Sequence, residues 1–323
     1  MKQPTLPFSG LKRKKRKCSF LKHLAQVGLT HVENCFANYG KAEGLCRFAG
    51  RINDANIEMT HVPLIEVPEI WLKQSDQMHL ALHIHAEGLQ LALFDYQNRQ
   101  PVHLFRLKIQ PWELPGLITQ QGLHQYLFRK VSITYDSDSW TLVPELFFDE
   151  NKIDLWMADL PAHQMHHALL ADERVYLIDR HHQSMESIAM LFPQATVKCW
   201  VHPWLQLTSP QQEKGEILFA NIEAKKISIH LIKEGKRLLA NPFESRSWED
   251  SLYFISAAMQ NFSCSENTMV VLTGEEVNEE LIASMAPYIK GLTPWLPPMG
   301  LHLPKTESMP AQWHSVLMHT LCA

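Results

Sequence analysis

The clearest pattern in the chain is the alternation of apolar and polar positions at residues 78–85. A period of two residues is that of a strand with one buried and one solvated face. The turn at residues 86–88 ends in Gly88, which is free to adopt a positive φ. The apolar positions of the first strand are Met78, Leu80, Leu82 and Ile84, and its expected wet face carries His79, His83 and His85. Leucines at every second position from 89 to 93 and a run at 102–109 complete a predicted antiparallel meander.

The segments after this meander predict a looser alternation of helices and strands. Pro111 can open a helix, and Pro144 can start a short helix that carries Leu146, Phe147 and Phe148. Strands that alternate with helices favour an α/β arrangement with partly parallel pairing. The expected strands are residues 131–135, 140–143, 174–178 and 195–200, and the expected helices are 111–121, 144–148, 162–170 and 183–192.

The second half of the chain repeats the pattern of the first. Runs at residues 216–222, 226–232 and 237–241 predict another three-stranded meander. Ser247 then reads as an N-cap, followed by acidic residues near the positive end of a helix dipole. A buried strand at 268–272 and a helix at 276–288 follow. The chain therefore contains two predicted copies of a βββαβα unit.

A duplicated βββαβα unit resembles the plan of the actin-like (ribonuclease H-like) ATPase superfamily, whose two lobes hold a nucleotide between them. The resemblance covers residues 65–295. It implies an α/β fold with a first lobe at residues 61–205, and a second lobe at 206–323 that includes a C-terminal helix.

Three local strings resemble landmarks of a narrower, uncharacterised bacterial family, domain of unknown function thirty-eight twenty-two. They are the segments 141–147, 241–243 and 248–254, and the C-terminal Leu321-Cys322 resembles the end of that family. The family is similar in plan to the actin-like cytoplasmic components of type IV pilus and type II secretion assembly platforms. A shared fold does not fix a function, so the function must be argued from the site.

The superfamily resemblance implies three nucleotide-binding motifs, and the first of them is altered here. Its phosphate loop has the pattern D-x-G-x-[ST], in which the carboxylate holds hydrated Mg²⁺ and the glycine lets backbone N–H groups approach phosphate. The corresponding hairpin reads Ala86-Glu87-Gly88-Leu89-Gln90. The glycine is kept, but alanine replaces the acid and Gln90 replaces the hydroxyl.

The other two motifs are altered as well. The D-x-G pattern of the second lobe reads Asn221-Ile222-Glu223, which has neither the acid nor the glycine. The Gly-Gly turn on the adenosine side reads Thr273-Gly274-Glu275 and is followed by Glu276, so two carboxylates would repel phosphate. The positions of the degenerate nucleotide site are Ala86, Glu87, Gly88, Asn221, Glu223, Gly274 and Glu275.

Phosphoryl transfer depends on electrostatic stabilisation by bound Mg²⁺, and the altered motifs remove the carboxylate that holds it. We therefore expect a pseudo-ATPase that hydrolyses no ATP and has no cofactor. The alternative is that ATP and Mg²⁺ are bound at a shifted site near Glu87, Asp95 and Glu223. No nucleophile elbow, P-loop or dinucleotide-binding pattern occurs in the sequence.

Two other clusters have ordinary explanations. Asp136, Asp138 and Asp154 resemble a catalytic carboxylate cluster, but Ser137 and Ser139 beside them indicate a turn before a strand. His163, His166 and His167 have the i, i+3, i+4 spacing that could present three imidazoles to Zn²⁺ or Cu²⁺ from one side of a helix. A solvated helix face in a histidine-rich protein explains the same spacing, so we predict no metal site.

Composition narrows the classes of function. The chain has 30 Lys and Arg against 34 Asp and Glu, a net charge of −4, which argues against a dedicated nucleic-acid binder. No apolar stretch approaches the roughly 18 residues that a membrane span needs. Six cysteines without a C-x-x-C pair indicate unpaired thiols in a reducing compartment, so we expect a cytoplasmic protein.

Residues 1–60 differ from the rest of the chain, with a basic run at 12–17 and no sustained period. We interpret them as a poorly ordered extension, or as the product of a start assigned upstream of Met59. The alternative is an arm that binds nucleic acid or a membrane surface.

Three functional hypotheses follow. The first is a non-catalytic, degenerate actin-like scaffold or adaptor whose cleft or exposed sheet edge binds a protein partner. The second is a nucleotide- or metal-dependent enzyme with a non-standard site between the lobes, and the third is nucleic-acid binding through the N-terminal arm. Residues 312–322 predict a helix that docks back on its own lobe, with partner binding as the alternative.

Overall fold

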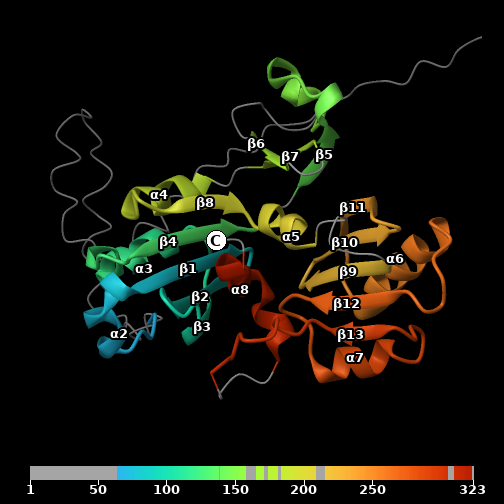
Figure 1. Ribbon diagram of the computed structural model, residues 1–323. Coiled ribbons are helices and arrows are strands. Elements are labelled where there is room, and N and C mark those ends of the chain that lie inside the picture. Colours follow the sequence, from blue (N-terminus) through green and yellow to red (C-terminus); the bar gives the residue numbers. More distant parts are fainter. Residues whose placement is uncertain are drawn as a thin grey trace, which may run out of the picture. The chain divides into compact units, whose positions relative to one another are not determined.

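The computed structural model describes residues 64–137, 139–157, 165–170, 174–180, 183–208, 215–304 and 309–321, and its ribbon is shown in Figure 1. By their contacts these residues belong to a single unit, Val62–Ala323. The basic run at 12–17, Met59, Asp138 and His163 lie outside the described residues, as does the start of the helix predicted at 162–170.

The first predicted meander forms three strands of a five-stranded mixed sheet with the order β3-β2-β1-β4-β8. β1 pairs antiparallel with β2 and parallel with β4, which in turn pairs parallel with β8. The strands are β1 (Met78–His85), β2 (Gly88–Asp95), β3 (Pro101–Lys108), β4 (Lys130–Tyr135) and β8 (Thr196–Cys199). The helices after β3, before β8 and after β8 are α3 (Leu114–Gln120), α4 (Gln183–Leu191) and α5 (Val201–Leu207).

The second half of the chain forms a second sheet of the same design, with the order β11-β10-β9-β12-β13. Ser247 caps α6 as predicted, because its Oγ accepts a hydrogen bond from the backbone N–H of Asp250. The strands are β9 (Glu216–Glu223), β10 (Lys226–Lys233), β11 (Lys236–Glu244), β12 (Met269–Thr273) and β13 (Leu292–Pro294), and the helices are α6 (Trp248–Asn261) and α7 (Glu279–Met285). The predicted duplicated α/β plan is confirmed.

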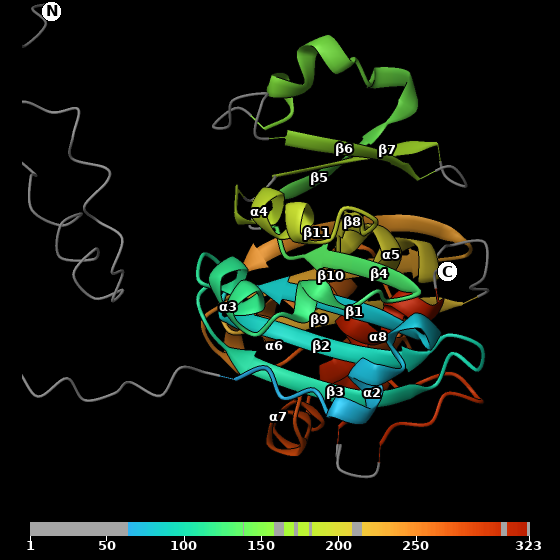
Figure 2. The ribbon, with the colours of Figure 1, turned by 90° about the vertical axis from the view of Figure 1, so that its left-hand side faces the viewer.

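A small antiparallel sheet is inserted between β4 and α4, and it corrects the helix predicted at residues 162–170. Its order is β5-β7-β6, formed by β5 (Trp140–Pro144), β6 (Met165–Leu170) and β7 (Val175–Arg180). β6 is a strand because all of its residues pair with β7, a tertiary contact that overrides local helical spacing. Tyr135, the last residue of β4, donates a hydrogen bond of 2.6 Å to Asp179 of β7 and so anchors the insert. Figure 2 shows the inserted sheet standing apart from the first sheet.

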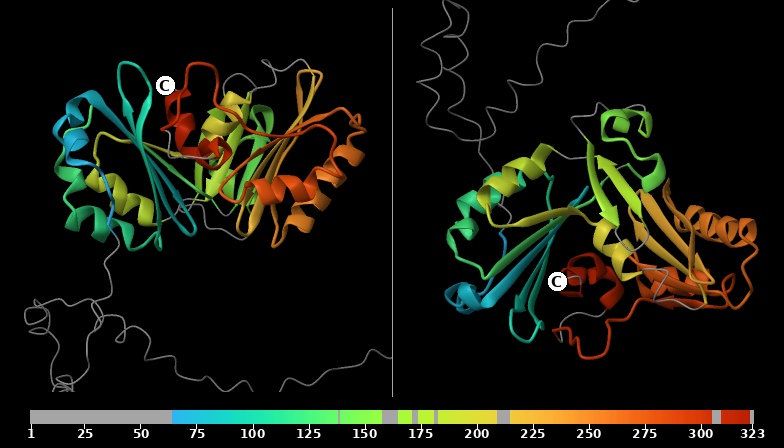
Figure 3. Two further views of the ribbon diagram at one scale, coloured as in Figure 1. Left: turned by 90° about the horizontal axis from the view of Figure 1, so that it is seen from below. Right: turned by 45° about the horizontal axis from the view of Figure 1, so that its top comes forward.

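The C-terminal helix α8 (His314–Leu321) corrects two further predictions. It packs on β1, β2 and α5, instead of docking back on the second sheet alone, and Figure 3 shows it in red. Trp313, Val316 and Leu317 join Phe94 in one buried apolar cluster. Because this helix covers the sheet, the face of β1 that was predicted to be exposed to solvent is buried. The residues of this face are His79, His83 and His85.

The remaining elements are short helices at the edges of the sheets. They are α2 (Glu69–Lys73) and the 3₁₀ helices η2 (Ser75–Gln77), η3 (Leu123–Gln125), η4 (Glu145–Phe147), η5 (Glu150–Leu155) and η8 (Pro310–Trp313).

Candidate functional site

A cavity of about 600 Å³ lies where the β1–β2 turn, the β9–β10 turn, β11 and the start of the inserted sheet meet. Four of the seven predicted site positions line it, namely Ala86, Glu87, Glu223 and Glu275. The other three adjoin these residues in the same strands and turns. The sequence therefore located the cavity, although most of its polar contacts come from residues that no motif indicated.

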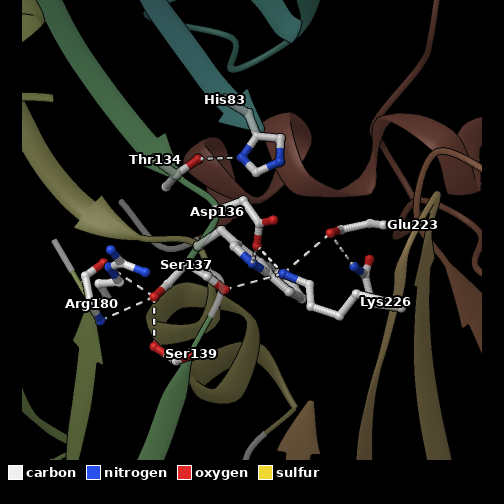
Figure 4. Close-up of polar contacts among 10 residues, drawn as sticks. His83, Thr134, Asp136, Ser137, Ser139, Arg180, Glu223 and Lys226 are labelled. Atoms are coloured by element: carbon white, nitrogen blue, oxygen red, sulfur yellow. Dashed lines mark hydrogen bonds and ion pairs between the residues drawn. The ribbon is translucent and has the colours of Figure 1, made fainter. Parts of the chain in front are cut away.

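A buried ion pair joins the two large sheets at the floor of this region (Figure 4). The Nζ of Lys226, at the start of β10, donates a hydrogen bond to the carboxylate of Asp136, the residue after β4. Trp200 Nε1 donates to the same carboxylate at 2.8 Å. Lys226 Nζ also lies 3.3 Å from the carboxylate of Glu223 and donates to the carbonyl oxygen of Ser137 at 3.2 Å. Asp136 is therefore part of the contact between the sheets, and its interpretation as turn chemistry was wrong.

The carboxyl groups of Asp136 and Glu223 differ in their pKa because Lys226 is hydrogen-bonded to Asp136 and lies farther from Glu223. Burial by itself raises the pKa of Asp136, but the adjacent Lys226 outweighs it and holds the pKa below its usual value. Burial, together with repulsion from Asp136, raises the pKa of Glu223 to about 7. Glu223 therefore keeps its proton to a higher pH than an exposed glutamate does, and Asn221 Nδ2 donates to it at 2.7 Å.

Glu275 is the second centre of contacts between the sheets. Gln90 Nε2 donates to Glu275 Oε1 at 2.6 Å and to the carbonyl oxygen of Gln312 at 2.9 Å. His85 Nε2 lies 3.0 Å from the same carboxylate oxygen and Arg106 Nε lies 3.8 Å from it. Burial raises the pKa of Glu275, but these contacts outweigh burial and lower the pKa to about 2. Two altered motif positions, Gln90 and Glu275, thus bond to each other.

Both glycines that remain from the expected motifs are required by neighbouring backbone. Gly88 does not adopt the positive φ that the turn suggested. A Cβ on Gly88 would lie 2.1 Å from the carbonyl oxygen of Leu107. Gly274 has φ +109°, and a Cβ there would lie 2.2 Å from the carbonyl oxygen of Ile222. Packing within each sheet explains these glycines without a bound phosphate.

The structure does not assemble the shifted site near Glu87, Asp95 and Glu223. Asp95 pairs with Met78, while the cavity end of the same hairpin pairs His85 with Gly88. Seven residues of strand separate the two ends by about 23 Å. The Asp95 carboxylate instead accepts hydrogen bonds of 2.9 Å from the backbone N–H groups of the following turn.

Two of the three histidines considered as metal ligands, His166 and His167, lie on a strand, so their helical spacing is lost. His166 and His167 are adjacent in β6, where successive side chains point to opposite faces. His166 Nδ1 lies 3.3 Å from the hydroxyl of Tyr135, whereas His167 packs against Phe148 and Tyr176. Within the described ranges, no group of three or more His, Cys, Asp or Glu is arranged to hold a metal ion.

Comparison with known proteins places the chain in a family. Residues 68–292 match the profile of the family described as "Protein of unknown function (DUF3822)". The protein belongs to the DUF3822 family. Among curated protein sequences, none matches this DUF3822 protein significantly.

Solved structures share the fold of this DUF3822 protein at low sequence identity. A protein from Bacteroides thetaiotaomicron, described as having an actin-like ATPase fold and unknown function, is 18% identical with a TM-score of 0.64, over 78% of this chain and 98% of that one. A structure described as the PilM-PilN type IV pilus biogenesis complex is 13% identical with a TM-score of 0.51, over 76% and 97% of the two chains. The predicted family and actin-like fold are confirmed. In the described part of this DUF3822 protein, no helix has the length and apolarity that a membrane crossing needs.

Proposed function

We propose that this protein is a non-catalytic actin-like scaffold or adaptor that binds a protein partner. The observation that carries the proposal is the contact between Glu275 and Gln90, in which two altered motif positions hold each other across the sheets. The division into lobes at residues 61–205 and 206–323 is part of this proposal, with α8 packed on the first sheet.

The residues of the cavity do not fit Mg-ATP. Five carboxyl groups but only two amines line it, and one of the amines, Lys226, is already bonded to Asp136. A triphosphate entering next to Glu275 would be repelled, because a buried carboxylate interacts strongly with nearby negative charge. The side chain of Ala86 has no oxygen with which to hold a metal-bound water.

Binding of a protein partner is supported by exposed apolar side chains on and beside the inserted sheet. Large apolar residues are mostly buried in a chain of this kind, so several exposed ones close together favour an interaction surface. The exposed residues between β5 and β7 are Leu146, Phe147, Leu155, Trp156 and Leu169. The similar structure described as a PilM-PilN complex contains two proteins, which is consistent with a binding role for the fold.

A nucleotide-dependent enzyme is the second candidate, and one observation favours it. Glu223 lines the cavity and has a pKa of about 7, which suits a group that accepts and returns a proton at neutral pH. The buried pair of Asp136 and Lys226 next to it also explains that value without catalysis.

A turnover assay separates the two candidates. The full chain, incubated with Mg-ATP, should release phosphate no faster than a matched sample of the Glu223→Gln variant, because no group holds Mg²⁺ or the attacking water. Release of phosphate that depends on Mg²⁺ and is lost in Glu223→Gln would overturn the scaffold proposal in favour of the enzyme.

A further inference from the structure

Three aromatic side chains are among those that line the cavity, namely Trp140, Trp156 and Phe243. Trp156 is 40% exposed, so its ring is accessible from the surface. The face of an indole or phenyl ring carries negative charge density and attracts cations, most often a guanidinium group. This aromatic lining therefore suits a planar cation better than a phosphate.

The charged residues that line the cavity also favour a cation. Glu275 is bonded to residues of the first sheet and Glu244 lies 2.6 Å from Arg246 Nη2, so these two carboxylates have partners. Asp136 and Glu223 share Lys226. Glu87 has no cationic partner among the described residues, and the exposed Lys225 can extend its ammonium group into solvent. A cation entering next to Glu87 would offset the excess of carboxylate.

The size of the cavity and its surroundings favour a segment of protein over a small free cation. A volume of about 600 Å³ is in the range of sites that hold drug-sized ligands, and exceeds what one side chain fills. Leu155, which precedes Trp156 in the chain, is 70% exposed, so apolar surface continues next to this tryptophan.

We propose that the cavity between the sheets binds an arginine or lysine side chain carried by an extended segment of the protein partner. This proposal rests on the proposed function and names the chemistry of the partner's binding segment. The basic group lies against Trp156 and forms an ion pair with Glu87. The apolar surface beyond the cavity contacts the residues that flank it.

A short peptide tests this assignment on the full chain. The probe is acetyl-Gly-Arg-Gly-amide, and its matched control carries citrulline, which has the same shape without the charge. We expect saturable quenching of tryptophan fluorescence by the arginine peptide in the millimolar range, and binding of the citrulline peptide that is about 10-fold weaker or worse. Equal binding of the two peptides, or no binding of the arginine peptide up to about 20 mM, would overturn the proposal.

Two variants locate the binding. Glu87→Gln should weaken binding of the arginine peptide about 3- to 10-fold by removing one ion pair. Glu279→Gln, an exposed carboxylate in the first turn of α7, should leave binding unchanged. Equal binding by wild type and Glu87→Gln would contradict a site in this cavity.

Measuring the binding of both the arginine peptide and Mg-ATP shows whether the assignment of a basic segment fails or the scaffold proposal fails. If neither the arginine peptide nor Mg-ATP binds, only the assignment of a basic segment fails. If Mg-ATP binds and displaces the peptide, the scaffold proposal fails instead.

Discussion

Lowering the pH from 7 to about 5 should unfold this protein, because four histidines are buried in neutral form where α8 packs on the first sheet. Burial, aided by neighbouring cations and histidines, lowers the pKa of His79, His83 and His314 to about 3 and places that of His319 well below its usual range. His79 is hydrogen-bonded to Ser132 at 2.9 Å, while His83 and His319 are both bonded to Thr134 at 3.0 Å.

The sign of the effect follows from the state that binds more protons. In the unfolded chain a histidine binds its proton below about pH 6.5, whereas these four stay neutral in the fold until the pH is much lower. The contribution of these neutral histidines to the free energy of unfolding is therefore fully present above pH 6.5 and is lost as the pH falls toward 3. The three histidines with a pKa of about 3 each remove about 2 kcal/mol by pH 5, or about 6 kcal/mol together, and His319 acts in the same direction. A loss of this size is comparable with the whole stability of a typical protein.

Circular dichroism and tryptophan fluorescence between pH 7.5 and 4 would measure this transition. Replacing His319 by glutamine should make the transition less steep, since one fewer proton is taken up on unfolding. His302→Gln, which changes an exposed histidine, should leave it unaltered. A protein that keeps its thermal midpoint down to about pH 4.5 would contradict the burial of the four histidines.

The Lys226→Met variant should be destabilised by about 3 to 5 kcal/mol, because Asp136 and Glu223 would then be buried without a cation. Lys226 is the residue whose hydrogen bond joins the ends of β4 and β10. Thermal unfolding followed by tryptophan fluorescence would show the midpoint fall by roughly 10 °C. Lys225→Met is the matched control, since this lysine is the preceding residue and is exposed, and it should lower the midpoint by about 1 °C or less.

A second substitution separates the charge from the packing of Lys226. Adding Asp136→Asn to Lys226→Met removes the uncompensated carboxylate, and the double variant should recover part of the lost stability. If the double variant is as unstable as the sum of the two single changes, the ion pair does not join the sheets in the way described here.

The sequence predicted the two large sheets because their patterns are local. The alternation at residues 78–85 and the runs at 216–222 and 226–232 each carry the period of a strand. β1, β9 and β10 appear at these positions. The altered motifs also located the cavity, since Glu87, Glu223 and Glu275 all line it. The reason is that a motif position lies in a turn whose place in the fold is fixed by the strands on either side.

What the sequence did not predict depends on residues that are far apart in the chain. His83 looked solvated because nothing near it indicated that α8, more than 200 residues later, would cover the sheet. Asp136 and Lys226 are 90 positions apart, and only the pairing of the sheets brings them together. The only local feature that could have indicated this ion pair is that each charged residue lies at one end of a buried strand, Asp136 after β4 and Lys226 at the start of β10. β6 was mistaken for a helix because its strand partner was not considered.

The most direct test of the scaffold account is calorimetric titration of the full chain with Mg-ATP and Mg-ADP at moderate salt, repeated at a second temperature. The account predicts no heat beyond dilution for either nucleotide, because the carboxylate of Glu275 lines the expected phosphate site and would repel a phosphate. Saturable binding tighter than about 100 μM, or roughly 5.5 kcal/mol of affinity, would contradict it and indicate a nucleotide-dependent protein.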